Sequence, residues 1–299
     1  MMTLPKLIRC LFLGFLLSLC LFVNIGLSQE TDSKNTLWRV HSKENSVYLL
    51  GSIHLFKREN YPLNKAIEKA FKDSQTLVLE VDMKSMTDPV TQQMMLSKGM
   101  LPQGDSLDKR ISQETYELAE RKTKELGLDI SALKQFKPWF FAMTITLVKL
   151  KSLGFNPQDG LDTYLFARAK ESGKQILGFE TFRQQLEMLD TLSTVNQDKL
   201  LCQTFKDLDI LANEMDIILK AWSTGDIKIL ESSMLKSFNE YPVLFEKLIA
   251  ERNKNWVKKI ESFLKTNNNY LVVVGAAHLA GKQGVVELLK EKGYSVEQL

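Results

Sequence analysis

Four short apolar runs constrain the fold of this chain more than any other feature of its sequence. Each run is continuous instead of alternating with polar residues, which is typical of parallel strands that are buried on both faces. An additional strand over residues 37–40 is predicted to pair with the first run in a hairpin that turns at residues 43–45. The four runs cover residues 47–50, residues 77–79 with Val81, residues 176–179 and residues 271–274.

Helical patterns separate these runs. Pro62 is predicted to begin a helix that extends to Lys72, because proline is common at the start of a helix. Residues 200–222 carry an apolar stripe with the helical repeat. Residues 139–148 are almost wholly apolar, which predicts a buried core helix, with a surface for lipid or a hydrophobic substrate as the alternative. The predicted fold is α/β: a small, mainly parallel sheet flanked by helices, with a large helical insertion between the early and late strands.

Residues 1–28 have the features of an export signal. Lys6 and Arg9 precede an apolar run, and small residues stand at 26 and 28, the spacing that a signal peptidase requires. A retained transmembrane anchor and a lipoprotein site at Cys20 are the alternatives, but the apolar run is shorter than the ~20 residues of a membrane span. We therefore predict cleavage after Ser28 and a periplasmic or secreted protein.

The remaining chain is predicted to be a short linker over residues 29–35 and a single domain over residues 36–299. Its formal net charge is +3, and loss of Lys6 and Arg9 with the signal would reduce it to +1. Such a balance gives no reason to expect nucleic acid as a partner, and membrane contact is not favoured. Cys202 would be the one cysteine left, which excludes an internal disulfide and predicts a partly buried helix residue.

The residues that follow the apolar runs are predicted to form the functional site. Two runs lead into the turns Gly51-Ser52-Ile53-His54 and Gly275-Ala276-Ala277-His278, and the other two lead into Glu80 and Glu180. In open α/β sheets, ligands bind beyond the carboxyl ends of the strands. We therefore expect two histidines and two glutamates to meet at one edge of the sheet.

Two copies of the Gly-x-x-His turn are stronger evidence for a functional site than one copy would be. Gly51 and Gly275 each follow a strand, where glycine permits a sharp turn and close approach of the backbone. A single histidine in such a place is more often a hydrogen-bonded core residue, but the pair indicates a shared site. His41, the third histidine, lies in a polar stretch and is predicted to have no such role.

Several chemistries fit two imidazoles and a carboxylate. His54, Glu80 and His278 could hold a divalent metal with open positions for water or substrate. Metal-free chemistry, with one histidine as general base and a glutamate as its orienting partner, is the alternative. Glu80 could also be a structural acid that pairs with a buried arginine.

Arg252 is the candidate for that arginine. It falls on the apolar stripe of a helix predicted over residues 243–264, and a buried guanidinium is costly unless it meets an acid or a ligand. The alternative is a packed stem whose charged end reaches solvent. The neighbouring Asn253 could supply an amide to the same place.

Common catalytic motifs are missing from the sequence. His-Glu-x-x-His, Gly-x-Ser-x-Gly, Gly-x-Gly-x-x-Gly, a phosphate loop and Cys-x-x-Cys-His do not occur. Their absence argues against zincins, α/β-hydrolases, nucleotide enzymes and covalent haem proteins.

The chain resembles the TraB/GumN family, which is similar to the TIKI metalloproteases and more distantly to ChaN-like and erythromycin-esterase proteins. The resemblance implies a ChaN-like fold with His54, Glu80 and His278 as metal-binding or catalytic residues, and with Arg252 and Asn253 in support. It also implies a divalent-metal-dependent peptidase, with Mn²⁺ or Co²⁺ as the metal; Zn²⁺ fits the same ligands. The matching segments are Leu37-Trp38, the two Gly-x-x-His turns, Tyr61-Pro62-Leu63, Leu79-Glu80-Val81-Asp82, Gly160-Leu161-Asp162, Gly178-Phe179-Glu180-Thr181, Trp222 with Gly225-Asp226, and Arg252-Asn253 with Trp256.

Three functions remain open at this level. The first is an exported metal-dependent hydrolase for a peptide or small-molecule substrate, in which Arg252 steadies a developing oxyanion or a substrate carboxylate. The second is a non-enzymatic binder of haem or metal. The third is a regulatory protein that sequesters a peptide without cutting it.

Overall fold

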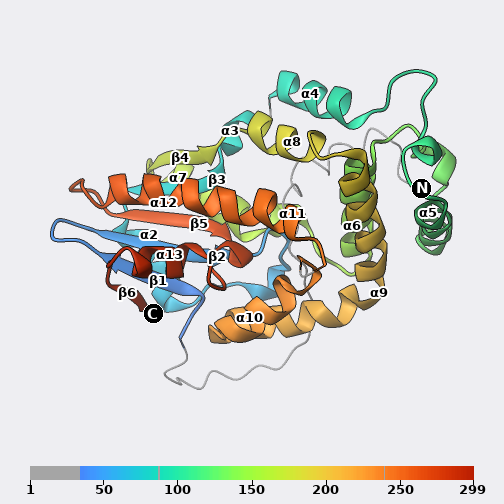
Figure 1. Ribbon diagram of the computed structural model, residues 1–299. Helices are drawn as coiled ribbons and strands as arrows, with labels where there is room; N and C mark the ends of the chain where they lie inside the picture. Colours follow the sequence, from blue (N-terminus) through green and yellow to red (C-terminus); the bar gives the residue numbers. More distant parts are fainter. Residues whose placement is uncertain (1–33, 87, 239) are drawn as a thin grey trace. The chain divides into compact units, whose positions relative to one another are not determined.

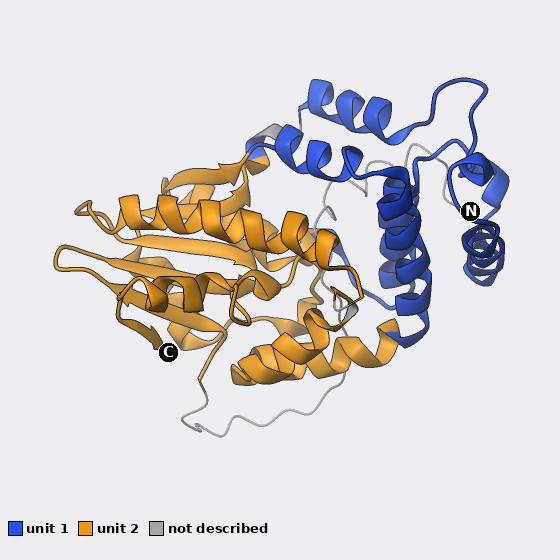
Figure 2. Ribbon diagram, viewed as in Figure 1, with its two compact units in different colours: residues 1–17, 84–157, 181–210 blue, residues 18–83, 158–180, 211–299 orange. Residues whose placement is uncertain are grey.

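The computed structural model describes residues 34–86, 88–238 and 240–299 (Figure 1). The predicted export signal and most of the predicted linker lie outside these residues. The described chain divides into two compact units (Figure 2). The sheet unit consists of residues 34–83, 158–180 and 211–299, and the insertion unit consists of residues 84–157 and 181–210. One domain over residues 36–299 therefore stays a prediction.

A six-stranded sheet with the order β4-β3-β5-β2-β1-β6 forms the centre of the sheet unit. The pairs β2–β5, β5–β3 and β3–β4 are parallel, whereas β1 is antiparallel to both β2 and β6. The predicted mainly parallel sheet and the β1–β2 hairpin are thus confirmed; β6 was not predicted. The strands are β1 (Leu37–His41), β2 (Ser46–Ser52), β3 (Thr76–Val81), β4 (Gln175–Glu180), β5 (Tyr270–Gly275) and β6 (Val296–Gln298).

Helices cover both faces of this sheet. Leu271 and Val273 of β5 pack into one core, whereas Val272 and Val274 pack into the other. The first core includes α2, α7, α10 and the last turns of α9, and the second includes α12 and α13, which lie along the near face of the sheet in Figure 1. Burial on both faces explains why the apolar runs do not alternate. The helices are α2 (Lys65–Asp73), α7 (Leu161–Glu171), α9 (Thr194–Thr224), α10 (Ile227–Met234), α11 (Pro242–Phe245), α12 (Glu251–Phe263) and α13 (Val285–Glu291).

Two helix predictions need correction in detail. The helix predicted to begin at Pro62 begins at Lys65, because the side chain of Asn64 accepts a hydrogen bond from the backbone N–H of Ala66 and caps it. The helix predicted over residues 243–264 consists of α11 and α12, joined by the π-helical segment η6 (Glu246–Ala250).

The insertion unit is helical. It contains α4 (Pro89–Gly99), α5 (Gln113–Glu125), α6 (Pro138–Ser152), α8 (Phe182–Asp190) and the first part of α9, while α3 (Met83–Met86) begins at the boundary. Phe141 of α6 is fully buried and packs edge-on against Phe205 of α9, which confirms residues 139–148 as a core helix. Cys202 on α9 is half-buried, as predicted. No helix among the described residues is long and apolar enough to cross a membrane.

Candidate functional site

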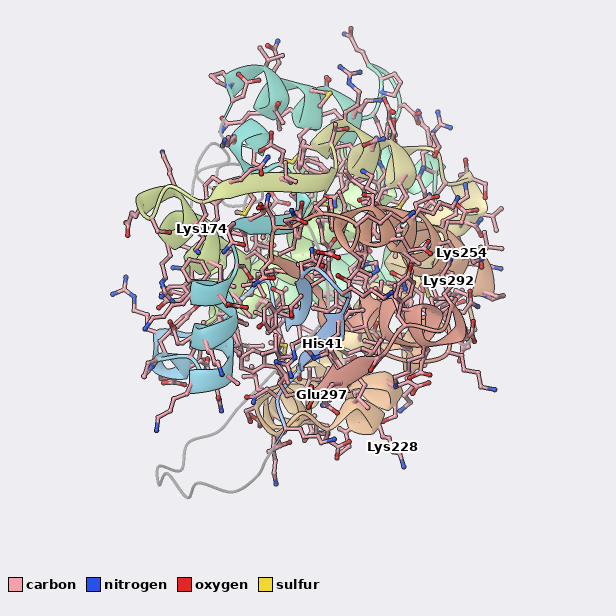
Figure 3. The ribbon with its side chains drawn as sticks, turned by 90° about the vertical axis from the view of Figure 1, so that its left-hand side faces the viewer. His41, Lys174, Lys228, Lys254, Lys292 and Glu297 are labelled. Atoms are coloured by element: carbon pink, nitrogen blue, oxygen red, sulfur yellow. The ribbon has the colours of Figure 1, made fainter. Side chains whose placement is uncertain are left out.

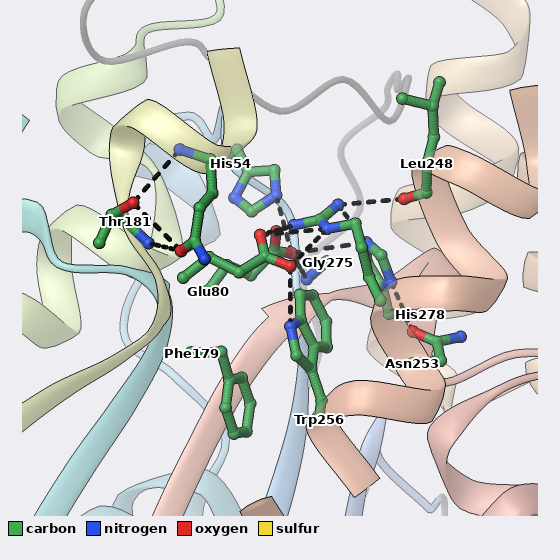
Figure 4. Close-up of polar contacts among 12 residues, drawn as sticks. His54, Glu80, Phe179, Thr181, Leu248, Asn253, Trp256, Gly275 and His278 are labelled. Atoms are coloured by element: carbon green, nitrogen blue, oxygen red, sulfur yellow. Dashed lines mark hydrogen bonds and ion pairs between the residues drawn. The ribbon is translucent and has the colours of Figure 1, made fainter. Parts of the chain in front are cut away.

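The four predicted strand-end residues lie together at the carboxyl edge of the sheet: His54 and His278 flank Glu80 (Figure 4), and Glu80 and Glu180 share the partner Arg252. Parallel pairing places Ser52 of β2 opposite Gly275 of β5, so the two Gly-x-x-His turns leave the sheet side by side. Glu80 is on β3, next to β5, and Glu180 ends β4. The register of these parallel strands is what brings segments about 200 residues apart into one site.

Glu80 lies between the two histidines. Its Oε1 atom is 3.7 Å from His54 Nε2 and 3.9 Å from His278 Nε2. Oε1 also accepts a hydrogen bond of 2.6 Å from the backbone N–H of Gly275, whereas Oε2 accepts one of 2.7 Å from Arg252. Glu80 is therefore both partner of a buried arginine and neighbour of both imidazoles.

Arg252 connects the residues of the site. Its side chain is 6% exposed, and all five of its N–H groups have acceptors. Nε donates to Glu180, Nη2 donates to Glu80 and Glu180, and Nη1 donates to the carbonyl of Leu248 and lies 3.1 Å from His278 Nε2. The inward position predicted for Arg252 is thus observed, and the cost of burying its charge is offset by two carboxylates.

The π-helical segment η6 stands directly before Arg252. Within it the chain closes a wider turn, in which the N–H of Glu251 donates to the carbonyl of Glu246, five residues earlier. The carbonyl of Leu248, also in this segment, accepts the Arg252 side chain at 3.1 Å. Single π-helical turns are rare in proteins, and those that occur are often found at functional sites.

His54 is held by Asp162, a residue that the sequence argument quoted but did not assign to the site. The Nδ1 atom of His54 is 2.7 Å from Asp162 Oδ2, which also accepts a hydrogen bond from Ser52. Burial opposes protonation of His54, but the charges of Asp162 and Glu80 outweigh it and raise the pKa of His54 to about 9. At neutral pH His54 is therefore an imidazolium.

His278 has the opposite environment. Its Nδ1 atom is 2.7 Å from Asn253 Oδ1, and its ring packs against Trp256 with 4.4 Å between the ring centroids. Burial, together with the positive charges of Arg252 and His54, lowers the pKa of His278 well below its ordinary value of 6.5. The two histidines of the repeated turn thus differ in charge.

Gly275 lies at the centre of the site and has no side chain. A Cβ atom built on it would lie 3.2 Å from Glu80 Oε1, 3.2 Å from His54 Nε2 and 3.6 Å from His278 Cδ2, which is tight contact. We call this position, between Glu80 Oε1 and His54 Nε2, the Gly275 gap. Gly51 is needed for a different reason: a side chain there would collide with Thr36, and the carbonyl of Gly51 accepts a hydrogen bond of 2.6 Å from the Trp222 indole.

The donor set does not fit a divalent metal in this arrangement. His278 Nε2 accepts from Arg252, and both oxygens of Glu80 have hydrogen-bond donors. Across residues 34–86, 88–238 and 240–299, no group of three or more His, Cys, Asp or Glu side chains is placed to hold a metal ion. Metal binding by His54, Glu80 and His278 therefore stays a prediction.

His41 lies away from the site. It ends β1, which is antiparallel to β2, and pairs across the sheet with Ser46, at the opposite end from His54. Its exposed ring is 3.8 Å from Glu297, and Figure 3 shows the two side chains close together. His41 therefore serves as a control for experiments on the other two histidines.

Comparison with known proteins extends this picture. The model of the TraB/PrgY/gumN family matches residues 36–298. The chain belongs to this family. Among its relatives is the uncharacterized protein YbaP of Escherichia coli (strain K12), 25% identical over 81% of this chain and 87% of the length of YbaP.

Other relatives of the chain bear the name of a protease. The metalloprotease TIKI homolog of Amphimedon queenslandica is 24% identical over 91% of this chain, and metalloprotease TIKI1 of Homo sapiens is 24% identical over 90% of it. The match spans 63% of the length of each of these two proteins. No solved structure matches the chain.

Proposed function

We propose that this protein is a hydrolase that cleaves peptide bonds at the Gly275 gap. The observation that carries the proposal is the approach of the His54 imidazole and the Glu80 carboxylate, 3.7 Å apart, on either side of a residue that has no side chain, Gly275. The names of the TIKI relatives support a peptide as the substrate.

The geometry supports acid–base chemistry between His54 and Glu80. Their 3.7 Å separation is too long for a hydrogen bond, so each atom can bond instead to water or to substrate. Glu80 Oε1 would accept a proton from the attacking water, and His54 Nε2–H would donate one to the leaving nitrogen. Proton transfer from Glu80 to His54 through solvent restores both groups.

Arg252 and Asp162 act on these two groups in the proposal. Because every N–H of Arg252 already has a protein acceptor, we assign it the task of holding Glu80 in place, and not that of binding an oxyanion or a substrate carboxylate directly. Asp162 keeps His54 oriented and protonated. Asn253 acts through His278.

A need for Mn²⁺, Co²⁺ or Zn²⁺ is a separate part of the proposal, and the name metalloprotease, which the TIKI relatives bear, supports it. Because the donor set does not fit a metal as arranged, we derive no step through one. We also propose that the protein works in the periplasm or outside the cell, on the basis of the signal-like residues 1–28.

Mass spectrometry of a peptide library incubated with the purified protein tests the activity. Cleavage is expected in the wild type and in His41→Asn, and His54→Asn and Glu80→Gln are each expected to lower its rate by about 10²–10⁴-fold. Parallel samples with EDTA, Mn²⁺, Co²⁺ or Zn²⁺ measure metal dependence. Equal cleavage in His54→Asn and the wild type would overturn the assignment, and recovery of intact but bound peptides would favour sequestration.

A further inference from the structure

We infer that His278 is a positioning residue whose Nε2 atom accepts a hydrogen bond from Arg252, and that it is not a metal ligand. Asn253 fixes the tautomer that makes this possible. The inference concerns the site of the proposed function and rests on that function for its activity readout alone.

The orientation of the Asn253 amide determines which nitrogen of His278 carries the proton. The Nδ2 atom of Asn253 donates to the backbone carbonyl of Gln283 at 2.7 Å, and a carbonyl can only accept. Oδ1 must therefore be the atom that faces His278 Nδ1, 2.7 Å away. Since Oδ1 is an acceptor, Nδ1 of His278 must carry the proton.

The other ring nitrogen of His278, Nε2, is an acceptor. With its proton on Nδ1, a neutral His278 has a lone pair on Nε2, and Arg252 Nη1 lies 3.1 Å from that atom. A guanidinium can only donate, so the contact is a hydrogen bond from arginine to histidine. Burial of His278 to 3% exposure and its lowered pKa agree with an uncharged ring.

The ring nitrogens of His54 have different partners from those of His278. The Nδ1 atom of His54 faces the carboxylate of Asp162, and its Nε2 atom makes no hydrogen bond to any residue in the described part of the chain. The two Gly-x-x-His turns therefore present one nitrogen to the Gly275 gap and one nitrogen to Arg252. A metal on His278 Nε2 would have to displace the guanidinium and remain beside its positive charge.

His278 helps to hold Glu80 in position through Arg252. Nη1 of Arg252 is fixed by Leu248 and His278, and this sets the direction of Nη2, which holds Glu80 Oε2 at 2.7 Å. Loss of the acceptor at residue 278 frees one side of the guanidinium and loosens the carboxylate at the gap. Groups that orient reacting residues in this way typically contribute about 10–100-fold to activity.

Nitrogen-15 NMR of histidine-labelled protein tests the inference directly. Only three histidines need assignment, which single His→Gln variants supply. The expected spectrum shows a protonated Nδ1 and an unprotonated Nε2 for His278, and both stay unchanged when diamagnetic Zn²⁺ is added. A protonated Nε2, or an Nε2 signal that shifts with Zn²⁺ together with that of His54, would overturn it.

Activity gives a second readout through a matched pair of variants. Glutamine places an amide oxygen near the position of Nε2, so His278→Gln is expected to recover part of the roughly 10–100-fold loss seen in His278→Leu. Equal loss in both variants, with Zn²⁺ affinity falling in step, would contradict a positioning role. Because the spectra require no substrate, a protein that cleaves no peptide would refute the proposed function and still leave this inference open to its own test.

Discussion

Gly275 is the residue at which the site depends on having no side chain. Its backbone angles, φ −50° and ψ 134°, are open to any residue, so its identity follows from the surrounding atoms and not from strain. The hypothetical Cβ lies 3.2 Å from both His54 Nε2 and Glu80 Oε1. Alanine would therefore fit the fold but occupy the place where we propose that water and substrate meet.

Replacement of Gly275 by alanine is accordingly expected to lower peptide cleavage by about tenfold or more, because an added methyl group displaces the reacting atoms. The melting temperature is expected to change little, since the neighbouring side chains need to move by only a few tenths of an ångström. Cleavage rate and thermal unfolding of the same sample check the two parts. Unchanged cleavage in a well-folded variant would place the reaction elsewhere.

Residue identities at the site were partly predictable. His54, Glu80, Glu180 and His278 could be placed because each follows a recognisable strand, and the inward Arg252 because it interrupts an apolar stripe. Asp162 was missed as a site residue because it follows no strand; it lies in the first turn of α7. The acidic residue in Gly160-Leu161-Asp162, at a helix start, was the available signal.

Among the elements, α12 and the π-helical segment before it do most to shape the site. Arg252, Asn253 and Trp256 all come from the first turns of α12 and contact Glu80, His278 and Glu180, respectively. Trp256 donates its indole N–H to Glu180 at 3.0 Å. Its ring also faces the Arg252 guanidinium, with 4.7 Å between the ring centroid and Arg252 Cζ. One helix therefore supplies the charge, the amide and the aromatic surface.

Removing the charge from α12 is expected to destabilise the sheet unit. Arg252→Met would leave Glu80 buried without its cation, and breaking a buried ion pair in this way costs about 3–5 kcal/mol. Urea unfolding followed by the fluorescence of buried tryptophans measures the free energy of unfolding. Arg58→Met is the matched control, because the Arg58 side chain is 90% exposed and its loss is expected to change little. Equal stability of the two variants would contradict the account of Arg252.

Elements were predictable where their sequence patterns were distinct. The parallel strands and α9 were found from apolar runs and a helical stripe. The short strand β6 has no such pattern, since Val296, Glu297 and Gln298 give only one apolar residue, and its pairing with β1 is a tertiary event. The π-helical turn could likewise not be predicted from the sequence. One extra residue in a helical turn does not visibly alter the spacing of an apolar stripe.

At the scale of the whole molecule, the His54–Asp162 pair links folding to pH. The pKa of His54 is raised from 6.5 to about 9 in the folded chain, so the folded chain binds this proton more tightly than the unfolded chain does. The stabilisation is fully present below pH 6.5 and is lost as the pH rises through about 9. The shift corresponds to about 3 kcal/mol for the coupled pair.

We expect the free energy of unfolding to fall between these two pH values in the wild type and to change much less in Asp162→Asn, which removes the carboxylate that raises the pKa of His54. Urea titrations at a series of pH values provide the measurement, with His41→Asn as the control that keeps the wild-type slope. A wild-type free energy that is flat across this range would show that His54 is not held as an imidazolium.

The strand order determines at which stage of folding the site is assembled. The β1–β2 hairpin and the β3–β4 pair do not touch each other in the sheet; β5 lies between them and joins them. In sequence, β5 follows all four, so a growing chain has His54, Glu80 and Glu180 long before it has the strand that unites them. Contacts of such long range form late in folding. A newly made chain therefore has no assembled site until β5 is made and pairs with β2 and β3.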